Sequence, residues 1–258
     1  MKTNKLFKMV INTIKRYNAS SMKPIKHNPK TRKHKDNKDN KNNKFINVPN
    51  MITILRIVLL FIVIHILLNN SFYGKIISFF LVILIIFLDG IDGYIARKLN
   101  SATEFGAVFD IAGDRIVEQV LWITFAYINL IPLWIPVIII TRGVLTDSIR
   151  SFALKQGMTA FGAKTMMKSK IGYFITASRF SRALYGIAKA LSFALLVSLT
   201  FINELVIRTK LINGPLVIKI LNITAYSIAW FTVALCVIRG IPVLIESKRL
   251  FDNNGKES

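Results

Sequence analysis

Four aspartates, Asp89, Asp92, Asp110 and Asp114, stand at regular spacing at the ends of two hydrophobic segments. Six of the 13 acidic residues in the chain fall within residues 89–118. Ionised carboxylates beside a bilayer are costly and are usually functional. Because four carboxylates in one place repel each other unless cations lie between them, the cluster indicates a site that uses cations.

The helical spacing predicts that the four carboxylates meet in one cleft. The first two are three residues apart and the last two are four apart, so each pair shares one face of its helix. The connection between the two helices is short, so they must be antiparallel neighbours. Three small residues on or near the same faces leave room for a ligand, namely Gly93, Ala96 and Gly106.

Carboxylate oxygens suit hard cations such as Mg²⁺ or Mn²⁺, and four carboxylates are enough to hold two ions. A site with two metal ions clamps both oxygens of a phosphoryl displacement. Arg97, beside the cluster, offers a planar fork for phosphate oxygens. The residues therefore predict chemistry on a pyrophosphate at the membrane edge. Simple helix capping and a cation transporter are the alternatives, and a transporter would place its acids at the midplane.

The elements that must position this site are predicted to be membrane helices. The chain has 258 residues, of which 53% are hydrophobic, as is typical of a multi-pass membrane protein. Its single cysteine, Cys236, excludes an intrachain disulfide. A bilayer needs about 20 apolar residues for each span. We expect an all-α fold of six transmembrane helices, at about residues 51–68, 75–97, 106–130, 132–152, 171–203 and 215–245.

The formal net charge of +22 is unevenly distributed. Residues 1–44 hold 14 Lys and Arg against two Asp, and we expect a basic, mostly disordered cytoplasmic tail. Residues 5–16 within it could form an amphipathic helix on an anionic membrane surface. Residues 45–248 are the predicted membrane domain, and residues 249–258 a short polar tail. The positive-inside rule places both termini and the aspartates in the cytoplasm. No nucleic-acid partner is expected, because aromatic side chains do not interleave with the charges of the tail.

The pattern D-x2-D-G-x2-A-R-x8-G-x3-D-x3-D is present without a departure. Its positions are Asp89, Asp92, Gly93, Ala96, Arg97, Gly106, Asp110 and Asp114. The pattern resembles the signature of the CDP-alcohol phosphatidyltransferase family. A second stretch, residues 47–56, is similar to the opening of the first membrane helix in that family. The resemblance covers roughly residues 45–200.

The resemblance implies a homodimeric enzyme of the cytoplasmic membrane, which transfers a phosphatidyl group from CDP-diacylglycerol to an alcohol and releases CMP. It implies two Mg²⁺ or Mn²⁺ ions, with Asp89, Asp92 and Asp110 as metal ligands. Asp114 would be the general base and would also contact a metal. The implied CDP-binding residues are Asn50, Thr53, Gly93, Ala96, Arg97 and Gly106.

Cationic residues outside the signature predict a second anion site, for an acceptor that carries a phosphate. They are Arg142 and Arg150, two turns apart on one helix, and the pair Lys168 and Lys170. The alternative is cytoplasmic charge that only sets topology. Their arrangement resembles the phosphatidylglycerophosphate synthase branch, which uses glycerol 3-phosphate, although two residues beside the lysines depart from the pattern of that branch.

The sequence thus predicts a membrane transferase of phospholipid synthesis, with glycerol 3-phosphate as the acceptor. Inositol phosphate, phosphatidylglycerol or an uncharged alcohol are alternative acceptors. Outside enzymes, a divalent-cation transporter and a membrane anchor are the alternatives. Glu118, one turn beyond Asp114, could orient a ligand or an arginine.

Overall fold

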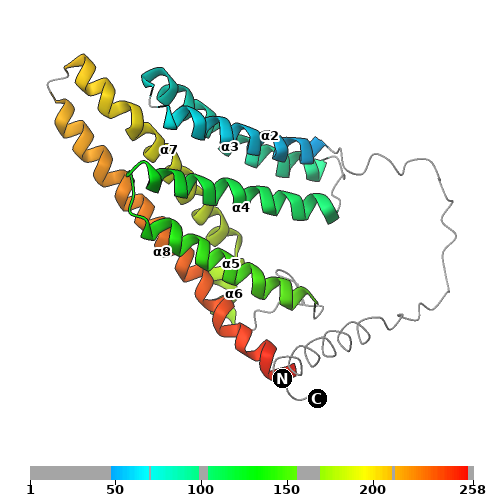
Figure 1. The fold of residues 1–258 in the computed structure, drawn as a ribbon. Helices are drawn as coiled ribbons and strands as arrows, with labels where there is room; N and C mark the ends of the chain where they lie inside the picture. The colour runs from blue at the N-terminus through cyan, green and yellow to red at the C-terminus, as the bar shows by residue number, and fades with distance from the viewer. Residues whose placement is uncertain (1–47, 70, 99–103, 156–168, 211–212, 255–258) are drawn as a thin grey trace, which may run out of the picture. The chain divides into compact units, whose positions relative to one another are not determined.

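The computed structural model describes residues 48–69, 71–98, 104–155, 169–210 and 213–254 (Figure 1). The regular elements of this part of the chain are all helices, which confirms the all-α class there. They are α2 (Val48–Leu68), α3 (Phe72–Lys98), α4 (Glu104–Tyr127), α5 (Trp134–Lys155), α6 (Lys170–Ala177), α7 (Arg179–Thr209) and α8 (Gly214–Asn254).

Four of these helices, α2, α3, α7 and α8, are long and apolar enough to cross a membrane. Large apolar side chains on them face outward, and Phe61 and Phe87 are 60% and 63% exposed. Exposed apolar surface on this scale suits lipid better than water. The other two long helices, α4 and α5, carry several charged residues each, which lowers their hydropathy. Six spans and cytoplasmic termini therefore stay predictions.

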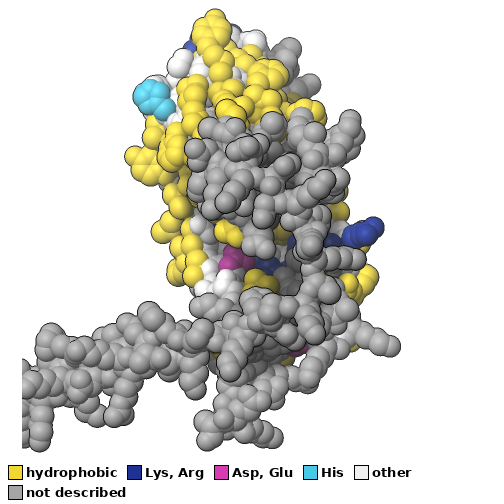
Figure 2. All heavy atoms as spheres, turned by 90° about the vertical axis from the view of Figure 1, so that its right-hand side faces the viewer, with side chains coloured by type: hydrophobic (Ala, Val, Ile, Leu, Met, Phe, Trp, Pro, Cys, Tyr) yellow, Lys and Arg dark blue, Asp and Glu magenta, His cyan; other side chains and the backbone are white. Residues whose placement is uncertain are grey.

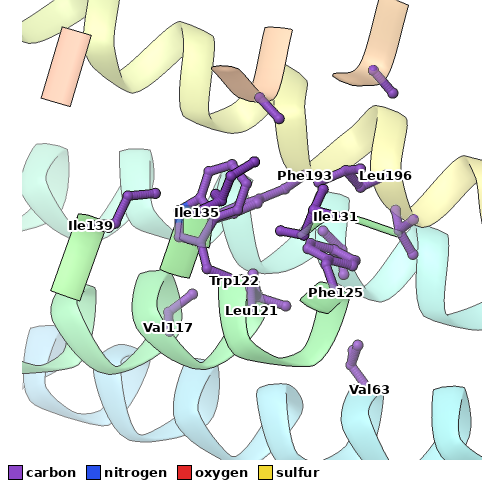
Figure 3. Packing of buried hydrophobic residues seen from close by; sticks show 14 of the residues in the cluster. Val63, Val117, Leu121, Trp122, Phe125, Ile131, Ile135, Ile139, Phe193 and Leu196 are labelled. Atoms are coloured by element: carbon purple, nitrogen blue, oxygen red, sulfur yellow. The ribbon is translucent and has the colours of Figure 1, made fainter. Parts of the chain in front are cut away.

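A buried aromatic cluster holds α4 against α7. The rings of Trp122 and Phe125 on α4 lie with their centroids 5.0 and 6.0 Å from the ring of Phe193 on α7. Figure 3 shows these side chains together with Ile131, Ile135 and the other members of the core. Aromatic pairs at this separation stabilise a core beyond the area they bury. The cluster fixes the C-terminal half of α4 and leaves its N-terminal half, with the aspartates, at the edge of the core.

The helix α2 packs against both α3 and α4. Gly113 on α4 is buried against Thr53 on α2, and a Cβ atom at Gly113 would lie 2.3 Å from Cγ2 of Thr53. A side chain of any size would therefore push the two helices apart. The missing Cβ lets α2 approach the aspartate-bearing half of α4.

The prediction of one helix over residues 171–203 is wrong, because Ser178 separates α6 from α7. The backbone at Ser178 is extended, with φ −61° and ψ 147°, and its Oγ accepts from the amide of Ser181 at 3.1 Å. A serine in this position caps the helix that follows. Arg239 of α8 donates to the carbonyl oxygens of Thr176 and Ser181 at 3.4 and 3.2 Å, so it bridges the break.

The predicted connection over residues 204–214 begins later than expected, because α7 continues beyond Glu204. The carboxylate of Glu204 lies 3.1 Å from Nζ of Lys75 on α3 and 2.6 Å from Nη2 of Arg208. The guanidinium of Arg208 stacks over the ring of Phe72 at 4.6 Å. These contacts join the beginning of α3 to the end of α7.

The predicted tail over residues 1–44, with its helix at residues 5–16, lies outside the described residues. At the other end of the chain α8 continues to Asn254, so it includes residues 249–254 of the predicted polar tail. The helix contains Pro242 and is far longer than the predicted span over residues 215–245.

Candidate active site

Three of the four signature carboxylates converge on one guanidinium, that of Arg56 on α2. Its Nη2 atom lies 2.5 Å from Oδ1 of Asp89 on α3 and 2.9 Å from Oδ1 of Asp114 on α4. Its Nη1 atom lies 4.0 Å from Oδ1 of Asp110. Arg56 is 3% exposed, whereas the three carboxylates are 40–44% exposed. Figure 2 shows acidic and basic side chains next to each other on one face, among hydrophobic ones.

Four more signature residues lie on the last turns of α3, where the helix is described but the side chains are not. These residues are Asp92, Gly93, Ala96 and Arg97. Among the described side chains, no three acidic, cysteine or histidine groups are close enough to hold a metal ion together. The donor set nevertheless fits a hard divalent cation, because it consists of carboxylate oxygens. They come from α3 and α4, which over their described residues are not the packed neighbours that the short connection predicted, because both pack on α2. The predicted metal ligands therefore stay predictions.

The other predicted CDP-binding residues lie on α2 and α4. Asn50 and Thr53 are buried on α2, about two turns and one turn before Arg56, respectively. Gly106 is partly buried on α4, one turn before Asp110. The structure thus places all three on the helices that carry the site, and their contact with a nucleotide stays a prediction.

Sequence reasoning assigned no role to Arg56 or to Gly113. A signal for Arg56 was present, because an arginine inside a hydrophobic helix requires a partner. Its own helix has no acidic residue, so the partner had to lie on another helix. Gly113 gave no comparable signal, since only the packing of α2 against α4 shows which glycine must lack a side chain.

A cavity of about 440 Å³ opens next to Asp114. It is lined by α4, α5, α7 and α8. Its five cationic residues are Arg115, Arg142, Arg150, Lys189 and Arg239. Its acidic residues are Asp114, Glu118 and Asp147. The cations outnumber the acids among these lining residues, which favours an anionic ligand.

Two of these arginines share one carboxylate. Nε of Arg115 on α4 lies 2.9 Å from Oδ2 of Asp147 on α5. Nη1 of Arg150, also on α5, lies 3.7 Å from Oδ1 of the same aspartate. Asp147 therefore links α4 to α5 beside the cavity, and the lining of the cavity still holds more cationic than acidic side chains.

Glu118 is buried and connects α4 to α7. It accepts a short hydrogen bond from the hydroxyl of Tyr185, and its Oε2 atom lies 3.4 Å from Nζ of Lys189. The same oxygen lies 3.7 Å from Nη1 of Arg115. The expectation that Glu118 orients an arginine agrees with this geometry, and it orients a lysine as well.

Arg142 and Arg239 are the cavity cations with buried nitrogens that lack a hydrogen-bond partner among the described residues. In each case the atom is Nε. Arg142 packs over Gly240 of α8, where an added Cβ atom would lie 2.9 Å from its Cγ atom. The guanidinium of Arg239 stacks on Tyr185 at 5.2 Å. Both arginines line the cavity and add to its positive charge.

The cavity brings together the two arginines that the sequence proposed for an acceptor phosphate. Of the two proposed lysines, Lys168 lies outside the described residues, and so does the side chain of Lys170. Lys189 and Arg239 were missed, because they lie on helices distant in sequence and no spacing rule connects them to the signature.

The chain matches the CDP-alcohol phosphatidyltransferase family over residues 46–202. The matched part is more than half of the chain and includes all four signature aspartates. The protein belongs to this family, as its sequence pattern predicted.

Curated relatives carry two different names. The "CDP-diacylglycerol--glycerol-3-phosphate 3-phosphatidyltransferase" of Wigglesworthia glossinidia brevipalpis is 34% identical over 118 residues, which are 43% of this chain and 63% of that protein. The Bacillus subtilis (strain 168) protein of that name is 31% identical over 116 residues, 40% and 60% of the two chains. The "Putative cardiolipin synthase" of Mycobacterium tuberculosis is 28% identical over 118 residues, 45% and 54%. The chain therefore matches less than two thirds of the length of these relatives.

Proposed function

We propose that this protein transfers a phosphatidyl group from CDP-diacylglycerol to glycerol 3-phosphate and releases CMP. Membership of the family supports the reaction type. The observation that carries the proposal is the cavity, in which Asp114 and a set of cationic side chains line one space. This arrangement suits an acceptor with a hydroxyl at one end and a phosphate at the other.

The donor end of the proposed site is the aspartate cluster. Asp89, Asp92 and Asp110, together with Asp114, would hold two Mg²⁺ or Mn²⁺ ions. Such ions neutralise the charge of a diphosphate and stabilise a departing phosphate. The cytidine and the diphosphate would contact Asn50, Thr53, Gly93, Ala96, Arg97 and Gly106.

In the proposed reaction the acceptor hydroxyl oxygen attacks the phosphorus of the phosphatidyl group. A new phosphorus–oxygen bond forms, and the bond between that phosphorus and the oxygen of the CMP group breaks. The hydroxyl proton passes to Asp114, and CMP leaves with the electron pair of the broken bond. Asp114 is a lining residue of the cavity, so its carboxylate is placed to receive that proton.

At the acceptor end, Arg142 and Arg150 would bind the phosphate, with Lys168 and Lys170 completing the site. Bonds between charged partners are roughly twice as strong as neutral hydrogen bonds, so the acceptor phosphate supplies much of the binding. Inositol phosphate would use the same cations. Phosphatidylglycerol is the second candidate acceptor, and the cardiolipin synthase name of one relative favours it.

The proposal includes the arrangement of the chain in the membrane. Six spans, with α4 and α5 beside the four apolar helices, would place the site at the cytoplasmic face of the cytoplasmic membrane. The protein would act as a homodimer. The four apolar helices and the basic residues near the aspartate end support this arrangement.

The experiment is CMP release by the purified full chain in detergent, with CDP-diacylglycerol and Mg²⁺, with and without glycerol 3-phosphate. Asp114→Asn should lower kcat by roughly 10²- to 10⁴-fold, the usual contribution of a general base. Glu204→Gln, at the opposite end of the bundle, is the matched control and should leave turnover unchanged.

The outcomes separate the candidate functions. Release that requires both glycerol 3-phosphate and Asp114 would support the proposal. Turnover only with another alcohol would keep the reaction and change the acceptor. Absence of CMP with every alcohol, from folded protein, would favour a transporter or an anchor.

A further inference from the structure

We propose that Arg56 is a resident counter-cation, which partly neutralises the aspartate cluster without a divalent ion and competes with that ion for the same carboxylates. The inference rests on the proposed use of divalent cations at this cluster. It concerns a residue on α2, outside the aspartate signature.

The geometry gives Arg56 a central position. A single nitrogen, Nη2, contacts Oδ1 of Asp89 at 2.5 Å and Oδ1 of Asp114 at 2.9 Å, so one guanidinium joins α3 to α4. The second terminal nitrogen faces Asp110 at 4.0 Å. Arg56 therefore lies where the carboxylates of both helices converge, which is also where a shared cation would have to bind.

Burial explains why Arg56 holds this position. At 3% exposure, the guanidinium cannot be solvated by water, so it must find its counter-charges inside the protein. The guanidinium also stabilises the two ionised carboxylates, because Asp89 and Asp114 would repel each other at this range without a cation between them. The close approach of α2 and α4 at Gly113 and Thr53 lies one turn from Arg56 and brings the guanidinium within reach.

A divalent cation at the cluster would need carboxylate oxygens that Arg56 already contacts. It would also meet a positive charge only a few ångströms away. A neighbouring charge at this range shifts the protonation equilibrium of a carboxylate by roughly ten- to a thousandfold, and an effect of this size is expected on cation binding as well. Loss of the guanidinium should therefore tighten binding of a divalent ion, whereas a purely structural arginine would weaken it or leave it unchanged.

The test is Mn²⁺ binding to the metal-stripped full chain in detergent, followed by the electron paramagnetic resonance signal of free Mn²⁺. We expect the Kd of Arg56→Gln to fall at least about tenfold below that of the wild-type protein. Arg56→Lys keeps the positive charge on a side chain of different shape, so its Kd should lie between those of the wild type and Arg56→Gln. The matched control is Lys75→Gln, which removes a cation paired with Glu204 at the other end of α3 and should leave the Kd unchanged.

Thermal unfolding gives a second measurement that is independent of turnover. In EDTA, Arg56→Gln should unfold at a lower temperature than the wild-type protein, because the carboxylates lose their counter-charge. Addition of Mg²⁺ should raise its Tm by more than it raises that of the wild type. If the Gln variant does not fold without metal, Arg56→Lys serves in both measurements.

Equal or weaker Mn²⁺ binding by both Arg56 variants, beside a wild-type protein that binds Mn²⁺, would overturn the inference and leave the proposed function intact. Absence of Mn²⁺ binding by the wild type would overturn the inference together with the proposed metal-dependent function. Tighter binding by Arg56→Gln, with an unchanged Lys75→Gln, would establish the competition.

Discussion

At the scale of single residues, the site depends on how its charges are paired. Asp89 and Asp114 meet a buried arginine, while Asp147 is shared between two arginines of the cavity. Arg142 has a buried Nε atom without a hydrogen-bond partner among the described residues. The carboxylate cluster is therefore partly compensated from within, and the cavity beside it holds more cationic than acidic side chains, a charge that an anionic substrate could neutralise.

Removal of the cavity cations should weaken binding of the acceptor and leave binding of the donor unchanged. We expect Arg142→Ala and Arg150→Ala each to raise the KM for glycerol 3-phosphate by roughly 10- to 100-fold, since a hydrogen bond to a charged group contributes about 1.5–3 kcal/mol. The KM for CDP-diacylglycerol should stay the same. Steady-state CMP release measures both constants, with Arg208→Ala at the far end of the bundle as the control. Unchanged acceptor KM in both cavity variants would show that no anion site exists there.

At the scale of the elements, the distance between α2 and α4 decides whether the site can form. Thr53 fills the space that a side chain at position 113 would need, and the helices approach there because residue 113 is glycine. The break at Ser178 has a comparable effect, since it separates α6 from α7 where Arg239 bridges the two helices beside the cavity. Helix contacts of this kind bring side chains that lie far apart in sequence together at the site.

Gly113→Ala should therefore destabilise the protein and disturb the site. Overpacking of a buried contact costs about 1–3 kcal/mol, so the Tm in detergent should fall by several degrees and CMP release should decrease. Gly186→Ala on α7 is the matched control, because an added Cβ atom there has no neighbour within 4 Å. Its Tm should stay the same or rise, as alanine favours helix over glycine. Equal Tm values for the two variants would contradict this account of α2 and α4.

At the scale of the whole molecule, the distribution of charge predicts how the chain lies in the membrane. The part of the chain before the first predicted span holds more than half of the net charge, while the turn between α4 and α5 has none. Basic segments stay on the cytoplasmic side during insertion. The aspartates lie at the ends of α3 and α4 that are opposite to the α4–α5 turn, so the site and both termini are expected on one side.

Cysteine labelling tests this topology, because the native Cys236 is buried and can be replaced by serine. In sealed right-side-out vesicles, a membrane-impermeant maleimide should label Leu133→Cys, whose parent side chain is exposed in the α4–α5 turn. Ser258→Cys, at the C-terminus, should be labelled only after detergent is added. The reverse pattern would place the site on the outer face and contradict the positive-inside argument.

Deletion of residues 1–40 should leave intrinsic activity largely intact, since the signature and the cavity lie elsewhere in the chain. CMP release by the truncated protein in detergent, compared with the full chain at equal Tm, measures this. A correctly inserted and folded truncation without activity would show that the tail takes part in turnover.

The sequence by itself determined the helical class, the family and the carboxylate cluster. These follow from local rules, because hydrophobic length, helical spacing and a contiguous signature are all read along one stretch of chain. Only the tertiary structure decided that Arg56 lies among the carboxylates, that Gly113 permits this, and that Lys189 and Arg239 join the cavity. The physical reason is that buried charges select partners through helix packing, and packing brings together residues whose separation along the chain follows no period.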